Sequence, residues 1–102
     1  LAGNLEIDTV VAQGCRPVYL PEGAVVGTFL TDTVAHWAPG KATEPNIVFH
    51  AGKTAWVLGV DESGEYYKLA YLCDYLWVPV EAMGPNYDAV WNGAPLPTNT
   101  VK

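Results

Sequence analysis

Prolines and glycines recur along the whole chain and divide it into short segments. There are 8 prolines and 10 glycines in 102 residues, and the segments between them are rich in Val, Thr, Tyr and Trp. Proline and glycine disfavour helix interiors, whereas β-branched and aromatic residues favour strands. No stretch keeps apolar residues at a helical period over the roughly ten positions that a helix needs. The sequence therefore predicts an all-β fold with almost no helix.

A series of segments has the composition and alternation of strands. Turn residues separate them at a density typical of a small barrel or sandwich. The predicted strands are residues 9–12, 25–30, 33–38, 47–50, 54–61, 65–72 and 75–80.

Three segments between or after these strands are predicted to be turns or loops. DESG, residues 61–64, is typical of a short hairpin loop, in which Gly64 can adopt positive φ. PGKATEP, residues 39–45, is polar and contains two prolines, so it is expected to project into solvent. The tail after Pro85 has one apolar cluster, at residues 89–91, and then becomes linker-like. We expect its last six residues to be loosely ordered.

Composition and charge exclude several classes of function. Half of the residues are hydrophobic and 16% are charged, which excludes intrinsic disorder and fits one small domain. The net charge is −6 and no basic cluster exists, so nucleic acid is not an expected partner. No apolar run is long enough to span a bilayer, and membrane insertion is not expected. Because Met83 is the only methionine, we expect a processed form or a segment of a longer protein.

The two cysteines, Cys15 and Cys73, lie 58 positions apart without a Cys or His at metal-ligand spacing. Two interpretations remain open: a disulfide in an oxidising compartment, or two unrelated buried thiols. The even cysteine count in a small, acidic chain rich in Trp and Tyr favours the disulfide and an extracellular or cell-envelope location.

The central part of the chain resembles bacterial SH3-like domains. AGKTAWVLG (51–59), GEYYKLAY (64–71) and LWVPVEAMG (76–84) follow the order and spacing of that family's glycine-led strand, W-Y-K-V strand and closing G-W-V strand with its short helical turn. The resemblance covers about half of the chain. It implies an SH3-like barrel at 33–86, with an N-terminal β extension at 1–32 packed on it and a C-terminal strand and linker-like tail at 87–102. It also implies an accessory module of a larger secreted protein.

The chain departs from the family at several positions. Tyr66 stands where the family usually has Trp, and Leu76 stands where it has the Gly before Trp77. Relatives that bind proline-rich helices use a Trp at the position of Tyr66 and a Tyr at the position of Ala82. Proline-rich ligands are therefore disfavoured.

The aromatic residues of 64–84 separate into two faces. In the predicted strand 65–72, Tyr67 and Tyr71 share a face with Leu69, which the resemblance turns inward, and Tyr66 shares the outer face with Lys68. Most of these aromatic side chains are expected to pack in the core. The candidates for a ligand-binding groove lie near turns or strand edges and are Trp37, Tyr66, Tyr75 and Trp77. Acidic neighbours, Glu65, Asp74 and Glu81, favour a ligand with an amine.

No pattern of catalytic or metal-binding residues is found in the sequence. A cysteine nucleophile needs a position at the start of a helix and a base held beside it, for which His36 and His50 are the candidates. LCDYL around Cys73 is instead predicted to be a hairpin. The acidic turn at 61–65 lacks the ligand spacing of a calcium site. We therefore expect no enzyme activity, no metal and no cofactor. The expected function is a binding or accessory module that recognises cell-wall peptide or glycan. The alternatives are a domain that braces a neighbouring domain or partner protein, and a small secreted inhibitor or enzyme.

Overall fold

The computed structural model describes residues 20–71 and 74–102, and this part of the chain is built from strands and one short 3-10 turn. The all-β prediction is confirmed. The predicted strand 9–12 and both cysteines, Cys15 and Cys73, lie outside the described residues, so the disulfide stays a prediction.

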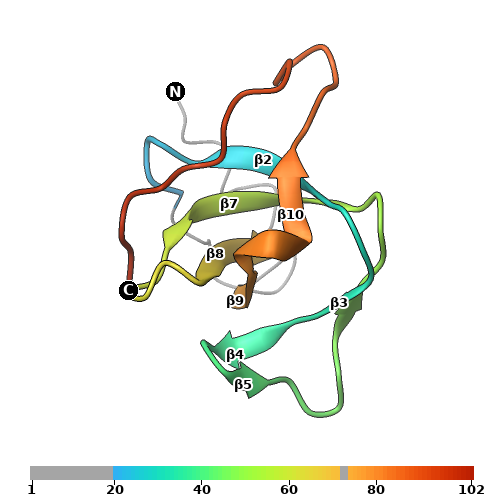
Figure 1. Ribbon diagram of the computed structural model, residues 1–102, viewed down its shortest axis with the longest axis vertical. Coiled ribbons are helices and arrows are strands. Elements are labelled where there is room, and N and C mark those ends of the chain that lie inside the picture. The colour runs from blue at the N-terminus through green and yellow to red at the C-terminus, as the bar shows by residue number, and fades with distance from the viewer. Residues whose placement is uncertain (1–19, 72–73) are drawn as a thin grey trace.

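One antiparallel sheet contains most of the strands, in the order β10-β2-β7-β8-β9-β4-β5 (Figure 1). Its strands are β2 (Val25–Phe29), β4 (His36–Ala38), β5 (Lys41–Ala42), β7 (Thr54–Val60), β8 (Tyr66–Tyr71), β9 (Asp74–Pro79) and β10 (Met83–Pro85). A separate pair is formed by β3 (Thr33–Val34) and β6 (Val48–Phe49), and the 3-10 turn η1 (Val80–Ala82) joins β9 to β10. Within the described residues the large sheet is open, with β10 and β5 as its edges, rather than closed into the predicted barrel. β2, which the sequence assigned to the N-terminal extension, is an inner strand beside β7.

The core lies on one face of this sheet and follows the alternation of the strands. In β8 the fully buried residue is Leu69, and Tyr67 and Tyr71 pack partly buried against the core, as predicted. Phe49 of β6 stacks on Phe29 of β2 with ring centroids 4.7 Å apart, which fastens the small strand pair to the large sheet. The buried cluster comprises Phe29, Ala35, Phe49, Ala55, Val57, Leu69, Leu76, Val78, Ala82 and Met83.

The hairpin loop between β7 and β8 forms where the sequence predicts it. Gly64 has φ +77°, a conformation that glycine adopts without steric cost. The Asp61 carboxylate accepts hydrogen bonds from the Ser63 hydroxyl and from the backbone N–H groups of Glu65 and Tyr66, at 2.8–3.1 Å. The loop is therefore held by the side chain of its first residue.

The predicted solvent loop at 39–45 is only partly a loop. Lys41 and Ala42 form β5, which pairs with β4 across the turn at Pro39 and Gly40. Thr43 is fully buried, and its hydroxyl donates to the Ala35 carbonyl and accepts from the Ile47 N–H. A threonine hydroxyl that satisfies two backbone groups can be buried, which the polarity of the segment does not reveal.

The C-terminal tail is also more structured than predicted. It runs back past β2 and ends near the loop between β7 and β8 (Figure 1). Val60 N–H donates to the Asn99 carbonyl and Val101 N–H donates to the Val60 carbonyl, both at 2.8 Å. Residues 99–101 are therefore hydrogen-bonded to the end of β7.

Candidate functional site

The sheet face opposite the core carries a band of large side chains on β8 and β9. Lys68 pairs with Trp77 across the two strands, and Ala70 pairs with Tyr75. Tyr66 pairs with Pro79 one step further along. Because directly paired residues point to the same face, Tyr66, Lys68, Tyr75 and Trp77 share this outer face.

The structure places three of the four predicted aromatic residues, Tyr66, Tyr75 and Trp77, on one face of the sheet. His36 of β4 pairs with Trp77 and so shares the outer face. Trp37 is the next residue along β4, where the register against β5 shifts between His36 and Ala38, and it is 47% exposed. Its large exposed indole does not line the groove beside Trp77.

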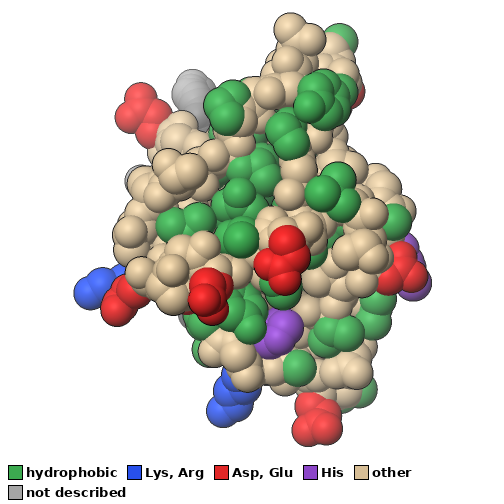
Figure 2. Space-filling view, in the orientation of Figure 1, with side chains coloured by type: hydrophobic (Ala, Val, Ile, Leu, Met, Phe, Trp, Pro, Cys, Tyr) green, Lys and Arg blue, Asp and Glu red, His purple; other side chains and the backbone are tan. Residues whose placement is uncertain are grey.

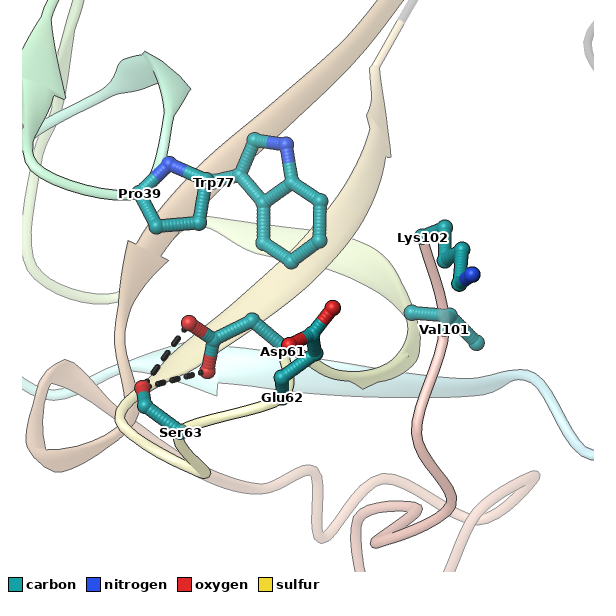
Figure 3. Close-up of a pocket in the computed structure, with 7 residues that line it drawn as sticks. All are labelled: Pro39, Asp61, Glu62, Ser63, Trp77, Val101 and Lys102. Carbon is teal, nitrogen blue, oxygen red and sulfur yellow. Dashed lines mark hydrogen bonds between the residues drawn. The ribbon is translucent and has the colours of Figure 1, made fainter.

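An open groove with a volume of about 660 Å³ lies beside Trp77 (Figure 3). Four segments far apart in sequence form it: the β4–β5 turn, the β7–β8 loop, β9 with Trp77, and the end of the tail. Trp77 and Pro39 lie on one side of the groove, and Asp61 and Glu62 lie across from them. The lining residues are Pro39, Asp61, Glu62, Ser63, Trp77, Val101 and Lys102.

The acidic side of the groove carries charge at neutral pH. Burial acts to raise the pKa of Asp61, but hydrogen bonds from Ser63 and from the backbone of Tyr66 and Glu65 together hold that pKa below its ordinary value of 3.8. Glu62 is exposed beside it. A carboxylate pair opposite an indole and a proline ring is suited to a cation with an apolar stem.

Lys68 already covers part of the predicted aromatic surface. Its ammonium lies 4.3 Å from the ring centroid of Tyr75 and 5.7 Å from that of Trp77. Burial lowers the pKa of Lys68. The outer faces of these two rings are therefore partly occupied by a cation of the chain itself, and Trp77 is only 8% exposed.

Tyr66 lies at a second hollow next to the first. This hollow has a volume of about 370 Å³ and is lined by Gly64, Glu65, Tyr66, Pro79, Val80 and Glu81. His36 contacts Tyr66 edge to face, with ring centroids 5.3 Å apart. Two of the three predicted acidic neighbours, Glu65 and Glu81, lie here, whereas the carboxylates of the larger groove, Asp61 and Glu62, were not predicted as its rim.

The histidines of the described chain lie apart from each other. His50 contacts Asp32 at 3.5 Å, with both side chains exposed, and His36 lies beside Tyr66. Among residues 20–71 and 74–102, no group of three or more His, Cys, Asp or Glu side chains could hold a metal ion.

Sequence reasoning missed the contributions of Pro39, Val101 and Lys102 to the groove. The turn at 39–40 was visible in the sequence, but no local pattern links it to the loop at 61–64. The return of the tail depends on Gly59, where an added Cβ would lie 2.5 Å from the Asn99 carbonyl oxygen. A glycine inside a strand indicates such a close approach, although it does not identify the segment that approaches.

Comparisons with protein-family models, with curated proteins and with solved structures found no match for this chain. In the described ranges, no helix has the length and apolar character needed to cross a membrane.

Proposed function

We propose that this chain is a non-catalytic binding module with an SH3-like arrangement that works outside the cytoplasm. Its groove at Trp77 receives an amine-bearing part of a cell-wall peptide or glycan. The observation that carries this proposal is the pairing of Trp77 and Pro39 with Asp61 and Glu62 across one open groove (Figure 3). The short turn η1 directly after β9 supports the SH3-like arrangement, because the resemblance places a helical turn after the closing strand.

The chemistry of the groove favours one end of such a ligand. An ammonium group can approach the carboxylates of Asp61 and Glu62 while its carbon stem lies against the indole and the proline ring. Anionic wall polymers are disfavoured by the same carboxylates and by the net charge of −6. The hydroxyl of Ser63 is held by Asp61 and adds one polar contact at the loop.

The test is a tryptophan fluorescence titration of the intact chain with soluble cell-wall stem peptides that carry a free amine, and with the same peptides after N-acetylation. We expect saturable binding that acetylation weakens. Glu62→Gln should weaken binding about two- to fivefold, because an exposed charge pair contributes roughly 0.5–1 kcal/mol. Glu22→Gln, an exposed carboxylate that does not line the groove, is the matched control. Equal affinity for both peptides, or no saturable binding, would contradict the proposal.

A second candidate, bracing a neighbouring domain or partner protein, is favoured by the loop after β10. Tyr87 is 77% exposed and Val90 is 80% exposed. The Asp88 carboxylate accepts from the N–H groups of Val90 and Trp91, so the loop is ordered while it presents these side chains. Hydrophobic side chains also gather in the middle of the face shown in Figure 2, over β7 and β10. If the folded chain binds no wall fragment, that result favours this second function.

A further inference from the structure

The end of β7 extends beyond the strand that covers its edge. β2 pairs with β7 from Thr28↔Thr54 to Val25↔Val57. β7 continues to Val60, and a bulge between Val57 and Gly59 changes its register against β8. The backbone groups of Val60 that point away from β8 therefore need another partner.

The tail supplies that partner as a short parallel strand. Val60 forms a parallel bridge with Thr100, with hydrogen bonds to Asn99 and from Val101. Gly59 makes the approach possible, since a Cβ there would lie 2.8 Å from a methyl carbon of Val101. The Lys68 ammonium donates a hydrogen bond to the Lys102 carbonyl oxygen.

This strand is held much less firmly than the segment before it. Trp91 packs edge to face on Trp56 with ring centroids 5.4 Å apart, and Leu96 packs against the core. Beyond Pro97, by contrast, the side chains are exposed except for a half-buried Val101. A segment that buries so little apolar surface opens at a low free energy, independently of the rest of the fold.

We propose that the end of β7 is a strand-accepting site for an extended peptide segment of a partner protein, which residues 99–101 occupy when no partner is bound. The accepted segment runs parallel to β7. It places a small or β-branched residue against Gly59 and a carbonyl or carboxylate oxygen near Lys68. The inference does not depend on a ligand in the groove.

The test uses the full chain with Val101→Pro, which removes the N–H that donates to Val60. The probe is the synthetic peptide LPTNTVK, which copies residues 96–102, and the control peptide LPTNTPK lacks the same N–H. We expect Val101→Pro to bind LPTNTVK at least about tenfold more tightly than the wild type does, because the wild-type tail competes at a high effective concentration. In NMR spectra, the amide signals of Leu58, Gly59 and Val60 should shift on binding.

A second variant separates strand pairing from nonspecific adhesion. Gly59→Ala combined with Val101→Pro places a Cβ where the added strand must lie, so it should bind LPTNTVK no better than LPTNTPK. Unchanged strand signals elsewhere in the sheet establish that each variant is folded. The proposal is overturned if folded Val101→Pro does not bind LPTNTVK, if both peptides bind equally, or if the Val60 amide stays protected from hydrogen exchange in Val101→Pro.

Discussion

At the residue scale, side chains that satisfy backbone groups decide where the loops lie. The turn at 61–64 could be predicted because Asp, Ser and Gly each favour it for a local reason, and Asp61 and Gly64 act as expected. The burial of Thr43 could not be predicted. Its two hydrogen-bond partners, Ala35 and Ile47, belong to segments whose positions depend on the whole sheet.

Replacing Asp61 by Asn should make the free energy of unfolding less dependent on pH in the acid range. The folded pKa of Asp61 lies below 3.8, so the unfolded chain takes up this proton first as the pH falls. The stabilisation by the carboxylate is therefore present above pH 3.8 and is lost as the pH falls through the folded pKa. Urea unfolding from pH 7 to about pH 2 should show a gap between wild type and Asp61→Asn that closes at the acid end. A gap that stays constant with pH would contradict this assignment.

Replacing Thr43 by Val should lower the stability of the chain without changing its fold. The substitution keeps the volume but leaves the Ile47 N–H without its partner. The Ala35 carbonyl loses the hydroxyl and keeps its hydrogen bond from the Thr43 N–H. We expect a loss of about 1–3 kcal/mol in the free energy of unfolding, measured by urea denaturation. Thr54→Val is the control, because Thr54 is exposed at the start of β7 and should change stability by less than about 0.5 kcal/mol. Similar losses in both variants would show that the buried hydroxyl has no special role.

At the element scale, strands that alternate over many residues were predicted best. β7, β8 and β9 lie within a residue or two of the predicted bounds, because each has one face fixed by burial. The segment 33–38 was predicted as one strand but divides into β3 and β4, with buried Ala35 between them. Strand propensity does not distinguish one continuous strand from two separate strands here. The two halves separate because they pair with different strands, β6 and β9.

The short strand β6 offers a direct test of what fastens the β3–β6 pair to the sheet. Phe49 stacks on Phe29 and contacts Tyr71 edge to face at 4.8 Å, so Phe49→Ala should cost about 3–5 kcal/mol. Val48→Ala changes the neighbouring residue of the same strand, which is 43% exposed, and should cost less than about 0.5 kcal/mol. Thermal or urea unfolding measures both. Comparable losses would mean that strand pairing, rather than the ring contacts, holds β6.

At the scale of the whole molecule, the candidate site is assembled from segments that no local pattern connects. The sequence proposed Trp77 as a residue of a ligand site, and in the structure Trp77 lines a groove together with Pro39, Asp61 and Val101. The sequence also grouped Trp37 with it, and Trp37 does not line this groove. Alternation predicts the face of a side chain once the strand pairing is known, and the pairing is a property of the complete sheet.

The largest predicted contribution at this scale is the link between Cys15 and Cys73. Joining residues 58 positions apart removes many conformations of the unfolded chain, which stabilises the fold by about 4 kcal/mol in the chain-entropy model. Cys15→Ser should therefore lower the melting temperature by at least about 10 °C. The double variant Cys15→Ser and Cys73→Ser should have the same melting temperature as the single variant. Reductant should lower the melting temperature of the wild type to that value.

Thiol counting distinguishes this link from the alternative of two buried thiols. A disulfide leaves no free thiol in the denatured wild type until reductant is added, whereas two thiols react at once. If the wild type melts at the same temperature with and without reductant and both thiols react, the cysteines are unlinked. In that case Cys15→Ser should change stability only by the replacement of one thiol, about 1 kcal/mol.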